Sequence, residues 1–158
     1  MTEPVTLLEA KVKLEAFCAY QERCEQEIRQ KIDTWGIFGE DVDFLVSDLI
    51  SNNFLNEQRF AEAFVSGKFR IKKWGRIKIK QHLKQKNISD YSINKGFAEI
   101  DPTEYWQTIL ALGKSKNKLI RAKDSWDRRI KLQRYLHSKG YEGDLVNDAI
   151  TEVLGSVV

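Results

Sequence analysis

The chain has 158 residues, of which 42% are hydrophobic and 31% charged, so it has enough apolar side chain for one or a few small cores and does not resemble a disordered or fibrous protein. No apolar run approaches the roughly 18 to 20 residues of a membrane span, and the first residues lack the layout of a signal peptide, so we expect a soluble, cytoplasmic protein. The net charge of +3 hides an asymmetry, because residues 1–62 carry 13 acids and 6 bases while residues 63–158 carry 10 acids and 20 bases. This asymmetry predicts a polyanion or an acidic protein surface as partner.

Apolar residues recur at three- and four-residue spacing along the whole chain, which predicts an all-α fold. In chain order, three single helical stretches are predicted at Val5–Glu22, Asn56–Ile71 and Pro102–Leu112. A pair of amphipathic helices follows each stretch, and the residues best suited to cap a helix N-terminus are Asn56, Ser89 and Asp101. The lysine-rich segment GKSKNKLIRAKD, which precedes the third pair, is compatible with both helix and loop.

The three helical pairs align with one another without gaps, at offsets of 51 and 53 residues. The first helix of each pair carries two apolar residues four positions apart, and these are Ile28 and Ile32, Ile79 and Leu83, and Leu132 and Leu136. Four residues later come Gly36, Asn87 and Gly140, which are residue types that tolerate a left-handed helix end. The alignment therefore predicts three tandem three-helix repeats.

We expect repeat boundaries at residues 1–52, 53–100 and 101–158, with the second and third repeats basic. A single unit of about 50 residues has a marginal core, so copies that stack end to end bury more apolar surface. The predicted architecture is an elongated, curved helical solenoid.

The reactive groups are few, which argues against catalysis. The chain has two histidines, His82 and His137, and neither stands in a metal-binding or catalytic motif; no glycine-rich phosphate loop occurs. Cys18 and Cys24 are predicted to be free structural thiols. We therefore predict no catalytic residue, no metal and no cofactor, with a cysteine–histidine hydrolase as the weakest alternative.

Residues 77–100 have the order of a DNA-reading helix-turn-helix, with a predicted helix, a short turn and a second helix. Its second helix offers Lys95 as its one base, against Asp90 and Glu99, and its apolar stripe is shared by all three repeats. This pattern is typical of a packing surface and not of a recognition helix.

Bases are concentrated in two segments of the chain. Nine lie between Lys68 and Lys86 with no acid among them, and nine lie between Lys114 and Arg134 with two acids. Like charges at this density repel each other, so an external anion is expected to offset them. The residues predicted to bind a partner or nucleic acid are Lys68, Arg70, Lys72, Lys73, Trp74, Arg76, Ile77, Lys80, Lys84, Arg128, Arg129, Lys131 and Arg134.

Three apolar or aromatic residues in the first basic segment admit more than one interpretation. Ile77 either meets a neighbouring repeat or forms the apolar centre of a basic contact patch. Trp74 and Phe69 either stack on nucleobases or belong to the core.

The ordered motifs FLNEQRFAEAFV, WGRIKIKQHLKQKNIS and KLQRYLHSKGY, together with CEQEIRQKI in the first repeat, resemble the RecX regulators of the bacterial RecA recombinase over nearly the whole chain. The sequence departs from that family's pattern at Cys24, where Ser is usual, at His82, where Glu is usual, and at Asn87, where Gly is usual.

The resemblance implies a regulator that binds the RecA filament on DNA and inhibits its recombination, ATPase and coprotease activities, in DNA repair and the SOS response. It implies possible single- or double-stranded DNA contact as well, and we expect a monomer with no membrane partner. The alternative is a helical repeat protein that binds nucleic acid without sequence preference and without specificity for the recombinase.

Overall fold

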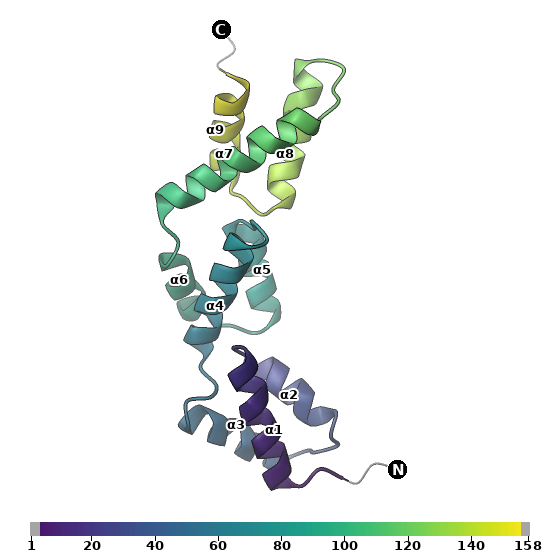
Figure 1. Ribbon diagram of the computed structural model, residues 1–158, viewed down its shortest axis with the longest axis vertical. Helices are drawn as coiled ribbons and strands as arrows, with labels where there is room; N and C mark the ends of the chain where they lie inside the picture. Colours follow the sequence, from purple (N-terminus) through teal and green to yellow (C-terminus); the bar gives the residue numbers. More distant parts are fainter. Residues whose placement is uncertain (1–3, 156–158) are drawn as a thin grey trace. The chain divides into compact units, whose positions relative to one another are not determined.

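The structure is a computed structural model that describes residues 4–155, and over these residues it is all-helical. Three successive sets of three helices confirm the predicted fold class (Figure 1). The helices are α1 (Leu7–Tyr20), α2 (Glu25–Asp33), α3 (Glu40–Ser51), α4 (Glu57–Arg70), α5 (Arg76–Gln85), α6 (Asp90–Ala98), α7 (Pro102–Leu119), α8 (Ser125–Ser138) and α9 (Gly143–Leu154). The division at residues 1–52, 53–100 and 101–158 stays a prediction.

Side-chain caps begin the helices where the sequence predicts them. Asn56 Oδ1 accepts a hydrogen bond from Arg59 N at 2.8 Å, and Ser89 Oγ accepts one from Ser92 N at 3.3 Å. Asp101 caps α7 in the same way, with Pro102 at the first helical position, where its missing N–H is not needed. All three predicted caps are confirmed.

The three predicted left-handed helix ends are also present. Gly36, Asn87 and Gly140 have φ of +72°, +61° and +97°. The aligned apolar pairs that precede them are fully buried in every repeat. The register read from the sequence therefore corresponds to equivalent places in the three helical pairs.

The described chain divides into two compact units whose boundaries fall inside α4, α5 and α6. Unit 1 holds the residues up to Phe64 together with Leu83–Lys95, and unit 2 holds Val65–His82 together with the residues from Gly96 onward. In unit 1, α3 packs against α1 and α2 around a core that is centred on Leu14, Ile28 and Leu45.

In unit 2, α7, α8 and α9 pack against one another around Tyr105, Ile109, Leu132 and Ile150. The predicted helical stretch Pro102–Leu112 lies within α7, which continues to Leu119, so the first part of the lysine-rich segment that the sequence left open is helical. Gly113 does not break the helix. It is buried, and a Cβ there would lie 3.1 Å from Val153 Cγ2, so this glycine allows α7 to approach α9 closely.

Two turns of unit 2 are joined by main-chain atoms. Gly75 N donates to Lys139 O at 2.7 Å, and Ile77 N donates to Gly140 O at 2.9 Å. A Cβ on Gly75 would lie 2.4 Å from Gly140 O, so only glycine permits this approach. The α4–α5 turn is thereby fixed against the α8–α9 turn.

Candidate nucleic-acid and partner-binding surface

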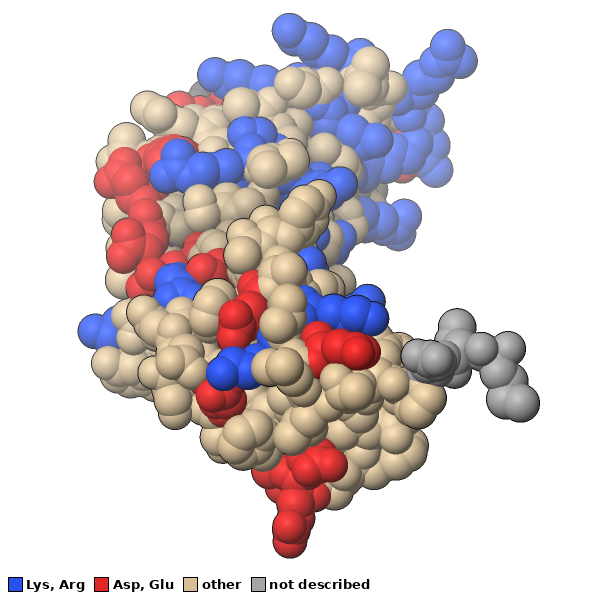
Figure 2. Space-filling model, turned by 60° about the horizontal axis from the view of Figure 1, so that its bottom comes forward, with Lys and Arg blue, Asp and Glu red and all other residues tan. Residues whose placement is uncertain are grey.

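The two units differ in charge. Unit 1 carries 14 acids and 9 bases, whereas unit 2 carries 9 acids and 17 bases. Figure 2 shows Lys and Arg side chains gathered over one part of the surface and Asp and Glu side chains grouped elsewhere. The candidate surface for a polyanion therefore lies on unit 2.

The first basic segment has both exposed bases and an exposed apolar side chain. Ile77 is 45% exposed, and Lys72, Lys73 and Lys80 are exposed too. None of these three ammonium groups forms an ion pair within the described part of the chain. The Ile77 side chain is therefore available for a contact, while its backbone N–H meets Gly140 of the neighbouring helical set.

The aromatic residues of the first basic segment have different surroundings. Phe69 is buried, with its ring centroid 5.7 Å from that of Tyr105, so it belongs to the core. Trp74 is half-buried, and its ring centroid lies 4.5 Å from that of His82. Lys68 Nζ and Lys78 Nζ lie 5.0 and 4.6 Å from the Trp74 ring, so the indole already has cationic and aromatic neighbours.

Arg76 is built into a polar cluster under the two joined turns. Its guanidinium lies 2.8 Å from Glu142 Oε2 and 3.9 Å from the centroid of the Tyr105 ring. The Tyr105 hydroxyl donates to Glu142 Oε1 and accepts from Arg76 N. Burial and the hydrogen bond to Glu142 raise the pKa of Tyr105, so its hydroxyl stays a donor at neutral pH. The structure thus gives Arg76 a structural contact in addition to its charge.

Two further predicted residues are held by acids. Arg70 Nη1 lies 3.4 Å from Glu104 in unit 2. Lys84 lies in unit 1, where its ammonium is 2.7 Å from Asp90. Lys84 is therefore not part of the basic surface described for unit 2.

In the second basic segment, Arg128 and Lys131 hold the α7–α8 loop. Arg128 donates to Asn117 O and Oδ1 and to Ile120 O, at 2.8 to 3.2 Å. Lys131 donates to Arg121 O at 2.7 Å and lies 3.0 Å from Asp127. Arg129 is half-buried and Arg134 is exposed.

Next to this loop lies an open hollow of about 470 Å³ that the sequence did not reveal as a site. It is lined by Lys116, Leu119, Ile120, Arg121, Lys131, Arg134 and Tyr135. Of these, Lys131 and Arg134 were predicted as binding residues, and Lys116 and Arg121 were not. The bases of the segment GKSKNKLIRAKD were visible in the sequence, but it is the partly helical structure of this segment that brings them next to Lys131 and Arg134.

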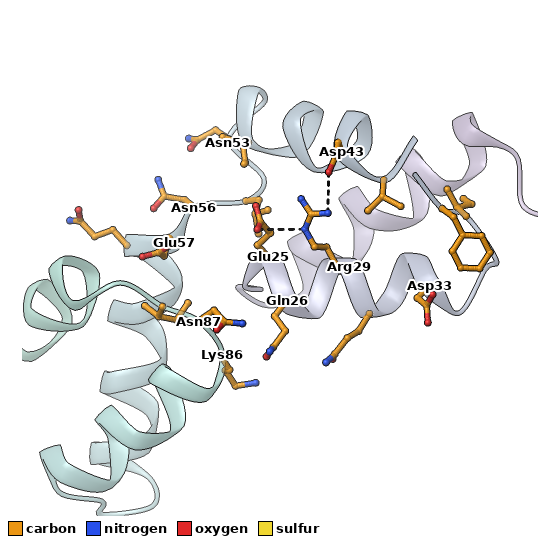
Figure 3. Close-up of a pocket in the computed structure, with 18 of the residues that line it drawn as sticks. Glu25, Gln26, Arg29, Asp33, Asp43, Asn53, Asn56, Glu57, Lys86 and Asn87 are labelled. Atoms are coloured by element: carbon orange, nitrogen blue, oxygen red, sulfur yellow. Dashed lines mark hydrogen bonds and ion pairs between the residues drawn. The ribbon is translucent and has the colours of Figure 1, made fainter. Parts of the chain in front are cut away.

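A larger hollow, of about 1060 Å³, lies in unit 1 and is lined by residues of α2, α3 and α4 and of the turn before α6. Figure 3 shows Arg29 between Glu25 and Asp43, at 3.5 and 3.1 Å. Glu57, also on this hollow, accepts hydrogen bonds from Ser89 N and Oγ. Burial alone would raise the pKa of Glu57, but the hydrogen bonds outweigh this effect and hold the pKa below its usual range. Of the six charged residues that line this hollow, three are thus joined in ion pairs and Glu57 is held by Ser89.

The thiols and histidines form no reactive centre in the described residues. Cys18 and Cys24 are buried and free, as predicted. Burial raises the pKa of Cys18, and it raises that of Cys24 to about 11, so neither is a thiolate at neutral pH. No group of acids, histidines and cysteines suited to a metal ion occurs within residues 4–155, and no helix there is long and apolar enough to cross a membrane.

Comparison with known families gives two matches, which together cover more than half of the chain. The second three-helix domain of RecX matches residues 56–96, and the third three-helix domain of RecX matches residues 103–150.

Individual relatives agree with these matches. A regulatory protein RecX from Clostridium botulinum (strain Alaska E43 / Type E3) is 30% identical over 134 residues, which cover 84% of this chain and 62% of the relative. One from Prosthecochloris aestuarii is 27% identical over 139 residues, which cover 87% of this chain and 89% of the relative. The chain spans about 60% of the length of the clostridial relatives that it matches.

Solved structures share the fold. The crystal structure of RecX from Lactobacillus salivarius has a TM-score of 0.82 at 18% identity and covers 93% of this chain and 96% of its own. A second crystal structure, of a regulatory protein RecX, has a TM-score of 0.83 at 22% identity, and the match covers 92% of this chain and 73% of that chain.

Proposed function

Because the chain belongs to the RecX family, we propose that it is a non-enzymatic regulator that binds the RecA recombinase filament on DNA. In this proposal, binding inhibits the recombination, ATPase and coprotease activities of the filament, in DNA repair and the SOS response. The observation that carries the proposal is the family match across residues 56–96 and 103–150, the part of the chain that holds both basic segments.

The charge of unit 2 supplies the physical basis of binding. A nucleoprotein filament presents phosphates and acidic side chains, and opposite charge accelerates the encounter of two macromolecules. The exposed Ile77, in the same segment as the exposed Lys72, Lys73 and Lys80, then adds an apolar anchor to the charged contact.

The direct test is a titration of the protein into the DNA-stimulated ATP hydrolysis of its own recombinase. We expect inhibition at near-stoichiometric amounts, and weaker inhibition by the Lys72→Gln/Lys73→Gln/Lys80→Gln variant. Arg76 is left unchanged in this variant because its contact with Glu142 supports the fold. Absence of inhibition by the wild-type protein at these amounts contradicts the proposal.

The second candidate function is that of a nucleic-acid-binding protein without recombinase specificity, and the basic hollow at the α7–α8 loop favours it. Under this alternative, the affinity for free DNA accounts for all inhibition. An excess of competitor DNA would then abolish inhibition of preformed filaments, whereas a protein contact with the recombinase would preserve part of it.

We further propose that the protein acts in the cytoplasm as a monomer. Sedimentation equilibrium of the full chain at physiological salt tests the monomeric state, and a mass near 18.4 kDa is expected.

A further inference from the structure

We propose that the hollow at the α7–α8 loop of unit 2 binds a segment of single-stranded nucleic acid, with phosphates on Arg121 and Arg134 and a base on its apolar floor. The inference rests on the proposed function, to which it adds a defined site of DNA contact. The ligand is a single strand of polynucleotide, and neither a duplex nor an acidic protein surface fits the observations as well.

Cations from three elements meet at this hollow. Lys116 comes from α7, Arg121 from the loop, and Lys131 and Arg134 from α8. Arg121 and Arg134 are exposed and form no ion pair with any described residue. A guanidinium presents paired donors that match the geometry of a phosphate, so these two side chains are the phosphate ligands of the proposal.

The C-terminal end of a helix usually repels an anion, and two cations of α8 reduce that repulsion at α7. The last carbonyls of α7 carry partial negative charge, which would disfavour a phosphate nearby. Arg128 donates to Asn117 O and Ile120 O, and Lys131 donates to Arg121 O. Arg128 thereby binds one of the last carbonyls of α7, Asn117 O, and both cations fix the loop, so Arg128 and Lys131 are positioning residues for the site.

Three of the lining residues, Leu119, Ile120 and Tyr135, are apolar or aromatic, and this part of the lining, here called the floor, distinguishes a single strand from other polyanions. Leu119 is 77% exposed, and Tyr135 is half-buried with Lys116 Nζ 4.9 Å from its ring centroid. An unpaired base can lie on such a surface, whereas the bases of a duplex are stacked inside it.

The other basic surface of unit 2 exposes the aliphatic side chain of Ile77 but no aromatic ring without close neighbours. Its aromatic residue, Trp74, already contacts His82, Lys68 and Lys78. Phosphate contact is therefore expected at both surfaces, and base contact at the α7–α8 hollow.

The test is fluorescence anisotropy with the full chain and a labelled oligothymidylate, at a series of salt concentrations. In Arg121→Gln/Arg134→Gln, the log–log salt slope should fall by about 1.4, since each phosphate contact on a single strand contributes about 0.7. The matched control is Lys114→Gln/Lys118→Gln, which removes two charges from exposed positions of α7 that do not line the hollow. The control should keep most of the wild-type slope.

The apolar floor has its own test. Tyr135→Leu keeps an apolar side chain and removes the ring, so the affinity should fall by roughly fivefold or more with the salt slope unchanged. The same oligonucleotide annealed to its complement should bind more weakly than the single strand.

Three results would overturn the proposal. Equal losses in the arginine variant and its lysine control would mean that only net charge matters. Equal affinity for single strand and duplex would exclude base contact, and equally effective competition by polyglutamate would indicate an acidic protein as the ligand. Circular dichroism of each variant verifies that it is folded.

Failure of this site and failure of the proposed function are separate outcomes. If Arg121→Gln/Arg134→Gln binds oligothymidylate like the wild type and the wild type inhibits the recombinase ATPase, the site is wrong and the regulatory function stands. If the wild type binds oligothymidylate through the hollow without inhibiting the recombinase, the site stands and the regulatory function is wrong.

Discussion

The contact between Gly75 and Gly140 leads to a prediction whose magnitude can be worked from the structure. In Gly75→Ala, the new Cβ would lie 2.4, 2.5 and 2.6 Å from Gly140 O, Gly140 C and Tyr141 N. All three are main-chain atoms, which cannot rotate away as a flexible side chain would. The two turns must therefore separate by about 1 Å to restore ordinary van der Waals contact.

That separation stretches the hydrogen bonds that join the turns. Gly75 N–Lys139 O at 2.7 Å and Ile77 N–Gly140 O at 2.9 Å would both exceed normal hydrogen-bond length. Each lost bond costs about 1 kcal/mol net, and forcing extra volume into a packed contact costs about 1–3 kcal/mol. We therefore expect Gly75→Ala to lower the free energy of unfolding by about 3–5 kcal/mol.

Urea unfolding followed by circular dichroism measures this change. The matched control is Gly67→Ala in α4, where a new Cβ would meet no atom within 4 Å. A glycine-to-alanine change inside a helix should raise stability by about 0.5–1 kcal/mol, so the two variants should change stability in opposite directions. A Gly75→Ala protein within about 0.5 kcal/mol of the wild type would refute the reasoning, since that is the range of a neutral surface substitution.

Three further predictions concern other parts of the molecule. Tyr105→Phe removes the hydroxyl that bridges Arg76 N and Glu142, so the free energy of unfolding in urea should fall by about 1–3 kcal/mol; an unchanged midpoint would mean that this cluster adds nothing to stability. Glu57 has a lowered pKa in the folded state, so above pH 4.5, its ordinary pKa, it stabilises the fold, and this stabilisation is lost as the pH falls through the lowered pKa. Ser89→Ala removes a hydrogen bond to Glu57 and should weaken the pH dependence of the free energy of unfolding in urea. An identical pH dependence in wild type and variant would contradict this prediction. Cys18 and Cys24 are buried, with raised pKa values, so iodoacetamide at pH 8 should label both rapidly only after unfolding; rapid labelling of the native protein, detected by mass spectrometry, would contradict the assigned burial.

The local features of the fold were predictable because they depend on neighbouring residues. The periodicity that places Ile28, Ile79 and Leu132 at equivalent positions reflects the 3.6-residue turn of the helix, and each is fully buried. Asn87 at a left-handed position and Asp101 before Pro102 follow from side-chain chemistry that acts within three or four residues.

The features that the sequence did not predict depend on contacts between distant segments. Nothing in the sequence indicates that Gly75 and Gly140, 65 positions apart, touch through their backbones. The close approach of Val153 from α9 to Gly113 of α7 is likewise a contact between distant segments.

The same limit applies to the binding surface. The charge of Arg128 and Lys131 was visible in the sequence, but the main-chain carbonyls that they bind were not, since those carbonyls belong to a loop whose state the sequence left open. Which bases hold the fold and which face solvent is decided by tertiary structure.

The joint between the α4–α5 and α8–α9 turns has a consequence for sequence variation. Its central hydrogen bonds run between main-chain atoms, and glycine is required only where the backbones of the two turns touch. Lysine side chains that make no bond across the joint, such as those of Lys72, Lys73 and Lys80, can therefore be exchanged, over evolution or by design, without dismantling the scaffold, whereas Lys139 Nζ donates to Lys72 O and belongs to the joint. A surface of this kind can acquire new affinities by point mutation while its framework is inherited intact.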